Sequence, residues 1–331
     1  MTPISISRTA SAVEHPLLIA RILDQGLANA PEQEIVYGDR LRCTYATLAE
    51  RVRRLASALA TLGVKPGATV AMMDWDSHRY LECFFAVPMM GAVLHTVNVR
   101  ISPEQVLYTI NHAQDDVILV NVEFLPLLES IRTRMRPGVK LVLINDGETV
   151  PATEVEFVAE YEAMLASSSA AFAFPRLDDG ARATTFYTTG TTGVPKGVYY
   201  SHRQLVLHTL AVSQTLATAP HATFGASDVY MPITPMFHVH AWGLPYVATM
   251  LGVIIGGSAL PLPLARSALE RGIDIIAGYG MSETCPILTL AHLRPHMCDW
   301  DAERQLPLLC RAGRPIPLVD RGFDPISEIL A

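Results

Sequence analysis

The sequence predicts an α/β protein in which a mostly parallel sheet is covered by helices. Short apolar runs alternate along the first half of the chain with longer segments whose apolar residues recur at helical spacing. This alternation is typical of parallel sheets, because a helix is the usual connection between two parallel neighbours. The chain has 331 residues, of which 50% are hydrophobic, and is therefore long enough for two ordinary domains with a large core.

The first half of the chain is expected to place its elements in a regular order. A helix and a two-stranded hairpin come first, and an amphipathic helix follows that carries Arg51, Arg53 and Arg54 on what we interpret as its solvated face. Ser102 and Pro103 begin a later helix as its N-cap and first helical residue. The expected helices cover 15–28, 47–62, 77–90 and a segment from 103 onward, and the expected strands cover 34–37, 42–45, 69–73, 92–97, 116–120 and 141–144.

A boundary is predicted where small residues, Pro175 and Gly180 follow one another over 166–180, because such a stretch suits a link between subdomains. We therefore divide the chain into an N-terminal α/β subdomain, 1–175, and a second α/β subdomain, 176–331. The second subdomain is expected to contain strands at 183–187, 198–200, 229–233 and 272–277, and a helix that Ser201 caps and that ends near residue 217.

A loop rich in threonine and glycine lies between two of these strands and predicts a phosphate site. Glycine lets the backbone N–H groups approach an anion, threonine adds hydroxyl donors, and lysine adds a mobile positive charge. The spacing differs from the usual P-loop, in which Ser or Thr follows the lysine, because Gly197 stands there. A flexible surface loop is the alternative. The candidate phosphate ligands are Thr188, Thr189, Gly190, Thr191, Thr192, Gly193 and Lys196.

Three further clusters carry groups that suit a nucleotide or a carboxylic acid. In the run 235–243, His238 and His240 suggest either an incomplete metal site or an aromatic wall in which one histidine faces a carboxylate. The run 256–259 follows an apolar strand, and its small residues permit a flat ring to lie against the backbone. The run 277–284 offers an aromatic ring for a base, a carboxylate for Mg²⁺ and a hydroxyl for a phosphate.

Charge, cysteine content and hydropathy exclude several classes of protein. The formal net charge is −7 and the basic residues are scattered, which argues against nucleic acid as a partner. The five cysteines are widely spaced and form no Cys-x-x-Cys pair, which is typical of a reducing compartment and predicts a cytoplasmic protein. The segment 229–265 has no Asp, Glu, Lys or Arg, but prolines and glycines interrupt it, so we expect buried core and no transmembrane segment.

These motifs resemble the adenylate-forming superfamily, which includes acyl-CoA synthetases, luciferases and the adenylation domains of peptide synthetases. The resemblance extends from about residue 15 to about residue 320, and its most specific parts are 188–197 and 279–284. Within the superfamily, the runs 236–242 and 256–261 are most similar to medium- and long-chain fatty acyl-CoA synthetases. The resemblance implies a large N-terminal region with two mostly parallel sheets flanked by helices.

The resemblance also implies a two-step ligase reaction on a fatty acid or a related carboxylate. The acid reacts with ATP to give acyl-AMP and pyrophosphate, and the thiol of CoA then displaces AMP, with Mg²⁺ as a cofactor. By motif, the β- and γ-phosphates would be bound by Thr188, Thr189, Gly190, Thr191, Thr192, Gly193 and Lys196; adenine by Gly257, Ser258, Ala259 and Tyr279, next to Gly280; Mg²⁺ by Glu283; the α-phosphate by Thr284; and the acyl carboxylate by His238.

The sequence departs from the family pattern in two places. The family has several dozen residues between the positions of Val253 and Ile254, which are adjacent here, and the resemblance ends near residue 320. We therefore expect an incomplete form of the enzyme, truncated and without the C-terminal lid domain. Adenylation for another thiol acceptor, and a nucleotide-binding remnant without catalysis, are the alternatives, and an oligomer is compatible with the sequence.

Overall fold

The fold is known from a computed structural model that describes most of the chain. The described residues are 9, 11–13, 15–147, 149–188, 194–218, 228, 230–232, 234–251, 266–267, 270, 277–281, 287–291, 293 and 297–319.

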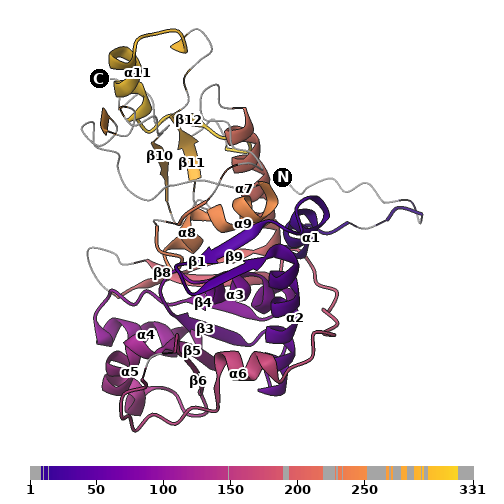
Figure 1. The fold of residues 1–331 in the computed structure, drawn as a ribbon, viewed down its shortest axis with the longest axis vertical. Coiled ribbons are helices and arrows are strands. Elements are labelled where there is room, and N and C mark those ends of the chain that lie inside the picture. The colour runs from indigo at the N-terminus through magenta and orange to yellow at the C-terminus, as the bar shows by residue number, and fades with distance from the viewer. Residues whose placement is uncertain are drawn as a thin grey trace, which may run out of the picture.

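The main sheet has seven strands in the order β7-β6-β5-β3-β4-β8-β9 (Figure 1). Neighbours from β7 to β8 pair in parallel, and β9 pairs antiparallel with β8 at one end of the sheet. The predicted α/β class and the mostly parallel sheet are thus confirmed. The strands are β3 Thr69–Met73, β4 Val93–Thr96, β5 Val117–Asn121, β6 Lys140–Ile144, β7 Ala159–Glu160, β8 Arg182–Thr188 and β9 Lys196–Ser201.

Both faces of this sheet are buried, because an apolar core covers each of them. Successive side chains of a strand point to opposite faces and so enter different cores. In β3, Val70 and Met72 belong to one apolar core, whereas Ala71 and Met73 belong to another. Helices α2, α3 and α6 contribute to the first core, and α4 and α5 contribute to the second. Their bounds are α2 Tyr45–Thr61, α3 His78–Met89, α4 Pro103–Ala113, α5 Leu125–Ile131 and α6 Tyr161–Ala166, with 3₁₀ turns at Val122–Phe124 and Arg132–Arg134.

The N-terminal elements are a helix, α1 Ala20–Asn29, and a hairpin of β1 Glu34–Tyr37 with β2 Leu41–Thr44. The helix begins at Ala20 and not at residue 15, because the backbone before it is bonded elsewhere. The N–H of Leu17 donates to Asp179 Oδ2 at 2.9 Å, and the N–H of Ile19 donates to His202 Nδ1 at 3.3 Å. These bonds attach the N-terminal segment to the residues just before β8 and to the start of a helix at His202.

The expectation that Arg51 lies on a solvated face is wrong. Its Nε donates to Glu82 Oε1 at 2.6 Å and its Nη2 donates to Glu162 Oε2 at 2.9 Å, while Arg79 binds Glu162 and Asp146, each at 2.7 Å. The side chain of Glu82 is only 2% exposed, so its charge requires a buried partner. The sequence pattern of α2 cannot show this, because Glu162 comes from α6.

The second half of the chain contains α7 His202–Ala217, which Ser201 caps through a capping box as predicted, α8 Val239–Trp242, α9 Leu244–Leu251 and α11 Ala302–Leu309. A three-stranded sheet of β10 Gly278–Gly280, β11 Ile287–Leu290 and β12 Arg314–Pro315 lies with α11 at one end of the molecule (Figure 1). Its described strands pair antiparallel, which corrects the expectation of a second mostly parallel sheet. Parallel pairing of β10 with β11 would need a longer crossover than the short connection between them.

Two predicted strands differ from the structure or lie outside it. Tyr230, Met231 and Pro232 are not part of a strand, since proline cannot donate to a ladder, and most of 272–277 lies outside the described residues. Strands from both sides of residue 175 share the main sheet, and the division into subdomains 1–175 and 176–331 stays a prediction.

Four of the five cysteines lie in the described part of the chain. Cys43, Cys83, Cys298 and Cys310 are free thiols there, and Cys285 lies outside it. No helix in that part is long and apolar enough to cross a membrane.

Candidate active site

The hairpin of β8 and β9 holds the two ends of the threonine- and glycine-rich loop. Thr188 ends β8 and pairs directly with Lys196, the first residue of β9. Lys196 is exposed, and its ammonium group has no hydrogen-bond or ion-pair partner within the described part of the chain. A lysine that is free of carboxylates at the mouth of such a loop fits a phosphate group.

One face of this hairpin is apolar and packs against the core. Phe186 and Tyr200 lie with ring centroids 5.4 Å and 5.7 Å from the ring of His240, and Phe84 of α3 lies 5.6 Å from it. His240 is fully buried, and neither ring nitrogen has a hydrogen-bond partner among the described residues. Burial lowers the pKa of His240 to about 3, so this histidine is neutral at physiological pH.

The opposite face of the hairpin is polar. The hydroxyl of Tyr187 forms a 2.7 Å hydrogen bond with Nδ1 of His112, which belongs to α4. The ring of Tyr187 also lies 5.2 Å from that of His95, whose Nδ1 is 2.8 Å from the buried carboxylate of Asp115. The two faces therefore connect the hairpin to different helices, α3 and α4.

The segment that carries His238 is fixed to the ends of two parallel strands. The carboxylate of Asp76, shortly after β3, accepts a hydrogen bond from the N–H of Met236, and Thr96 Oγ1, at the end of β4, donates to the carbonyl of Phe237 at 3.0 Å. His238 follows and is exposed. Because β4 and β8 are parallel, His238 and Thr188 both lie at the carboxyl edge of the sheet, where ligands of α/β proteins bind.

A left-handed turn separates His238 from His240. The φ angles of Val239, His240, Ala241 and Trp242 are 49°, 58°, 47° and 58°, and Gly243 follows at 72°. Non-glycine residues in this region each cost about 1–2 kcal/mol, and such strain is concentrated at functional sites. The turn directs His240 into its aromatic surroundings and leaves His238 exposed. The two imidazoles therefore do not converge on a shared ligand, as a metal site would require.

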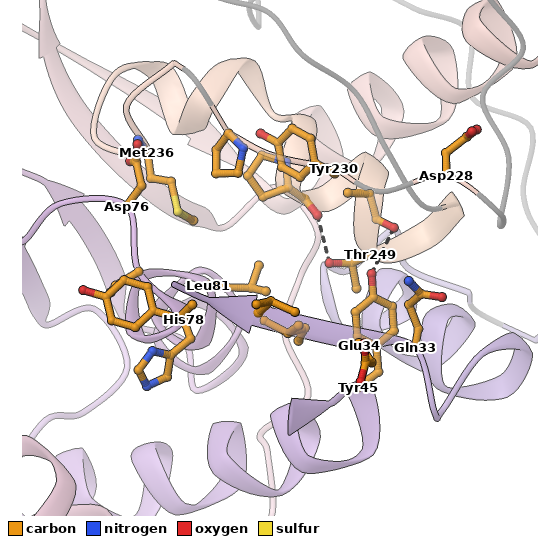
Figure 2. Close-up of a pocket in the computed structure, with 17 residues that line it drawn as sticks. Gln33, Glu34, Tyr45, Asp76, His78, Leu81, Asp228, Tyr230, Met236 and Thr249 are labelled. Carbon is orange, nitrogen blue, oxygen red and sulfur yellow. Dashed lines mark hydrogen bonds between the residues drawn. The ribbon is translucent and has the colours of Figure 1, made fainter. Parts of the chain in front are cut away.

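An apolar cavity of about 190 Å³ lies beside this segment, between β1 and the residues around 228–236 (Figure 2). Met236 lies in its wall, as do side chains from α3 and α9 such as Leu81 and Ala248. Tyr45 closes one side by donating its hydroxyl to the carbonyl of Ala248 at 3.1 Å. Such a cavity can bury a small apolar group.

The structure describes only part of the predicted site. Tyr279 and Gly280 lie half-buried in β10. The remaining predicted residues lie outside the described part of the chain: Thr189, Gly190, Thr191, Thr192, Gly193, Gly257, Ser258, Ala259, Glu283 and Thr284.

The residues that support the site were not predicted from the sequence, namely Asp76, Thr96, His112 and Tyr187. The position of Asp76 just after an apolar strand is a signal that could have identified it, because the carboxyl ends of parallel strands carry ligand sites. His112 gives no such signal, since only the fold brings it to Tyr187.

Comparison with protein families agrees with this arrangement. The model of a family described as "AMP-binding enzyme" matches residues 23–255, which is more than half of the chain. The chain belongs to this AMP-binding enzyme family. The match includes the hairpin, the loop between its strands and His238, and it ends close to the junction of Val253 and Ile254.

Several curated CoA ligases are similar to this chain. A long-chain-fatty-acid–CoA ligase of Thermus thermophilus is 36% identical over 85% of this chain and 60% of its own length. A 3-methylmercaptopropionyl-CoA ligase of Ruegeria pomeroyi is 38% identical over 83% of this chain and 50% of its own. A medium-chain-fatty-acid–CoA ligase of Ectopseudomonas oleovorans is 29% identical over 92% and 65%. The chain therefore spans half to two thirds of the length of these relatives.

The Thermus alignment also contains residues that this chain lacks. It is 335 positions long although it includes only 85% of the 331 residues, so the ligase has residues there without a counterpart. Among solved structures, an anthranilate CoA ligase with bound anthranoyl-AMP has a TM-score of 0.75 at 20% identity, over 92% of this chain and 65% of its own. The N-terminal domain of FACL13 from Mycobacterium tuberculosis has a TM-score of 0.72 at 22% identity, over 91% and 82%. These likenesses support the fold.

Proposed function

We propose that this chain is the nucleotide- and acid-binding part of an ATP-dependent fatty acid–CoA ligase. The observation that carries the proposal is the hairpin of β8 and β9, which holds Thr188 and Lys196 at the carboxyl edge of the sheet, and no described residue pairs with the Lys196 ammonium group. His238 lies at the same edge, fixed through Met236 and Phe237. Phosphate-binding and carboxylate-binding groups thus occupy one edge, as the reaction of an acid with ATP requires.

The proposed chemistry has two steps. A carboxylate oxygen of the acid attacks the α-phosphorus of ATP, and the bond to pyrophosphate breaks to give acyl-AMP. The thiolate sulfur of CoA then attacks the acyl carbon, and AMP leaves. Lys196 would neutralise charge on the leaving pyrophosphate, Thr284 would contact the α-phosphate, and His238 would orient the carboxylate. Mg²⁺, held by Glu283, would supply further charge neutralisation.

The other predicted nucleotide ligands keep the roles that the family pattern gives them. Thr188, Thr189, Gly190, Thr191, Thr192 and Gly193 would bind the β- and γ-phosphates, and Gly257, Ser258, Ala259, Tyr279 and Gly280 would enclose adenine. The apolar cavity beside Met236 would take the alkyl tail of the acid. The free thiols of Cys43, Cys83, Cys298 and Cys310 agree with a reducing compartment, and we place the protein in the cytoplasm.

Exchange of labelled pyrophosphate into ATP tests the first step directly. We expect exchange that depends on a fatty acid, measured with saturated acids of increasing chain length. Exchange followed by AMP release on addition of CoA would support the ligase. Exchange with release only on addition of a carrier-protein thiol would assign another acceptor, and ATP binding without exchange would indicate a nucleotide-binding remnant.

Lys196→Ala tests the assignment of the loop. Loss of a charge-assisted contact to phosphate should weaken ATP binding by about tenfold or more, as measured by calorimetry, because such contacts contribute about 1.5–3 kcal/mol. Lys65 is an exposed lysine away from the loop and provides the matched control, Lys65→Ala. Equal ATP affinity in the Lys196 variant and the Lys65 variant would contradict the assignment.

A further inference from the structure

We infer that Tyr187 is a positioning residue that fixes the base of the nucleotide loop to helix α4 through its hydrogen bond with His112. The inference rests on the proposed function, since it assumes that the loop binds ATP. Tyr187 stands one residue before the end of β8 and pairs directly with Gly197 on β9. It is therefore next to both ends of the loop, which leaves β8 after Thr188 and returns at Lys196.

The ring of Tyr187 occupies the space that a side chain at position 197 would need. A Cβ placed on Gly197 would lie 3.2 Å from Cε1 of Tyr187, which is closer than ordinary contact, and 3.4 Å from Cζ. Gly197 therefore leaves room for the tyrosine ring against the strand that leaves the loop. One side chain thus contacts both strands of the hairpin at the level of Thr188 and Lys196.

The ring is contacted from the other side by groups that belong to α4 and β4. The hydroxyl is 2.7 Å from Nδ1 of His112, and the rings of Tyr108 and His95 lie 6.5 Å and 5.2 Å from that of Tyr187. Helix α4, which carries His112, is capped by Ser102 and packs into the second core. Burial and the nearby charge of Asp115 raise the pKa of Tyr187, so the hydroxyl stays protonated and keeps its hydrogen bond.

A polar cavity beside Tyr187 makes the hydroxyl replaceable. His112, Tyr187 and Gly197 line this cavity of about 350 Å³, together with Arg136 and Arg182. Polar surroundings of this size admit water, which can take the place of the lost partner on His112. Removal of the hydroxyl should therefore loosen the attachment of Thr188 and Lys196, the two ends of the loop, to α4 without unfolding the protein. A loop that is less pre-organised binds its ligand more weakly.

Tyr187→Phe removes only the hydroxyl and is the first test. We expect the KM for ATP in pyrophosphate exchange, and the dissociation constant for ATP in calorimetry, to rise by about fivefold, because one neutral hydrogen bond contributes roughly 1 kcal/mol. The rate at saturating ATP should stay within about twofold, since the phenol does not contact the reacting atoms. Tyr199 is an exposed tyrosine on the neighbouring strand, and Tyr199→Phe is the matched control.

His112 provides a second, independent pair of variants. His112→Ala should weaken ATP binding as much as Tyr187→Phe, and the double variant should be no weaker, because a single interaction has been removed. His112→Asn places an amide near the position of Nδ1 and should restore the affinity. A loss of affinity that His112→Asn does not rescue, or a fall in rate at saturating ATP that equals the rise in KM, would overturn the positioning role.

The same ATP-binding measurements distinguish failure of the positioning inference from failure of the proposed function. If the unmodified chain and the Lys65→Ala control bind no ATP, the proposed function fails. If the unmodified chain binds ATP, Lys196→Ala weakens binding and Tyr187→Phe does not, the nucleotide loop stands and the positioning inference is overturned.

Discussion

The two faces of the β8–β9 hairpin are held by different kinds of interaction. On one face, Phe186 and Tyr200 pack with the buried ring of His240 against α3, and the described residues provide no hydrogen bond to the imidazole nitrogens. On the other face, Tyr187 is held to α4 by a hydrogen bond with His112 and packs on the His95–Asp115 pair. Phe186 and Tyr187, which are consecutive in β8, thus belong to an apolar layer and to a polar layer, respectively.

The difference indicates that one face of the hairpin supplies its stability, whereas the other face fixes its position. Apolar contact is strong but non-directional, and it stabilises the hairpin without fixing a precise geometry. A hydrogen bond contributes less net free energy, but it requires a defined distance and angle. We expect substitutions on the apolar face to change the free energy of unfolding most, and substitutions on the polar face to change ligand affinity most.

The largest effect is expected from Phe186→Ala. The side chain is 2% exposed, and truncation of a buried phenylalanine removes apolar contact and leaves a cavity, at a cost of about 3–5 kcal/mol in the free energy of unfolding. Urea denaturation followed by circular dichroism measures this change. Tyr199→Ala, at a residue of the same hairpin that is 56% exposed, is the control and should cost less than about 1 kcal/mol. Similar losses in the two variants would contradict the assignment of the apolar face.

A smaller effect is expected from Gly243→Ala, at the end of the turn that brings His240 to the apolar face. A Cβ at this position would lie 2.5 Å from Nε2 of His208, which donates a hydrogen bond to the carbonyl of Trp242, and φ is +72°. Strain and crowding together should cost about 2–3 kcal/mol. Gly67 has φ +88° and nothing near its Cβ position, so Gly67→Ala isolates the backbone term and should cost about 1 kcal/mol. Equal costs would show that His208 moves aside.

The smallest effect at neutral pH is expected from His240→Phe, which should instead change the dependence of stability on acid. Burial holds the pKa of His240 at about 3 in the folded chain, whereas its ordinary value is 6.5. The unfolded state therefore takes up a proton that the folded state does not, and stability falls as pH decreases from about 6.5 toward about 3. His240→Phe should remove this term, which is about 1.4 kcal/mol per pH unit.

The free energy of unfolding is measured by urea denaturation at a series of pH values between 7 and 4. The result is expressed as the difference in this free energy between variant and parent. His202, whose pKa burial lowers to about 4, is present in both proteins and cancels. The exposed His15 supplies the control variant His15→Phe, which should leave the difference flat. If the free energy of unfolding of His240→Phe depended on pH in the same way as that of the parent, His240 would not belong to the buried layer.

Local patterns predicted the elements, and the fold supplied the contacts between them. The apolar runs at 69–73 and 141–144 and the Ser102 cap reveal their strands and helix because the responsible interactions lie within a few residues. The role of Arg51 was missed because its partners Glu82 and Glu162 come from α3 and α6. The antiparallel β10–β11–β12 sheet was missed because its three short strands give little periodicity.

The site shows the same limit. Its loop was predicted because glycine, threonine and lysine at close spacing carry the chemistry themselves. The contact of His112 with Tyr187 joins a helix end to a strand that is 75 residues away, and no spacing rule connects them. Asp76 and Thr96 support His238 in the same long-range way.

The position of β8 in the main sheet has a consequence for synthesis on the ribosome. β4 pairs with β3 early, but its other neighbour is β8, which is made long after it. Until residues 182–188 emerge, the strand Val93-Leu94-His95-Thr96 has one edge without its partner strand. Unpaired apolar edges bind other chains, so slow translation between β4 and β8 would favour aggregation, and chaperones that cover this edge would favour folding.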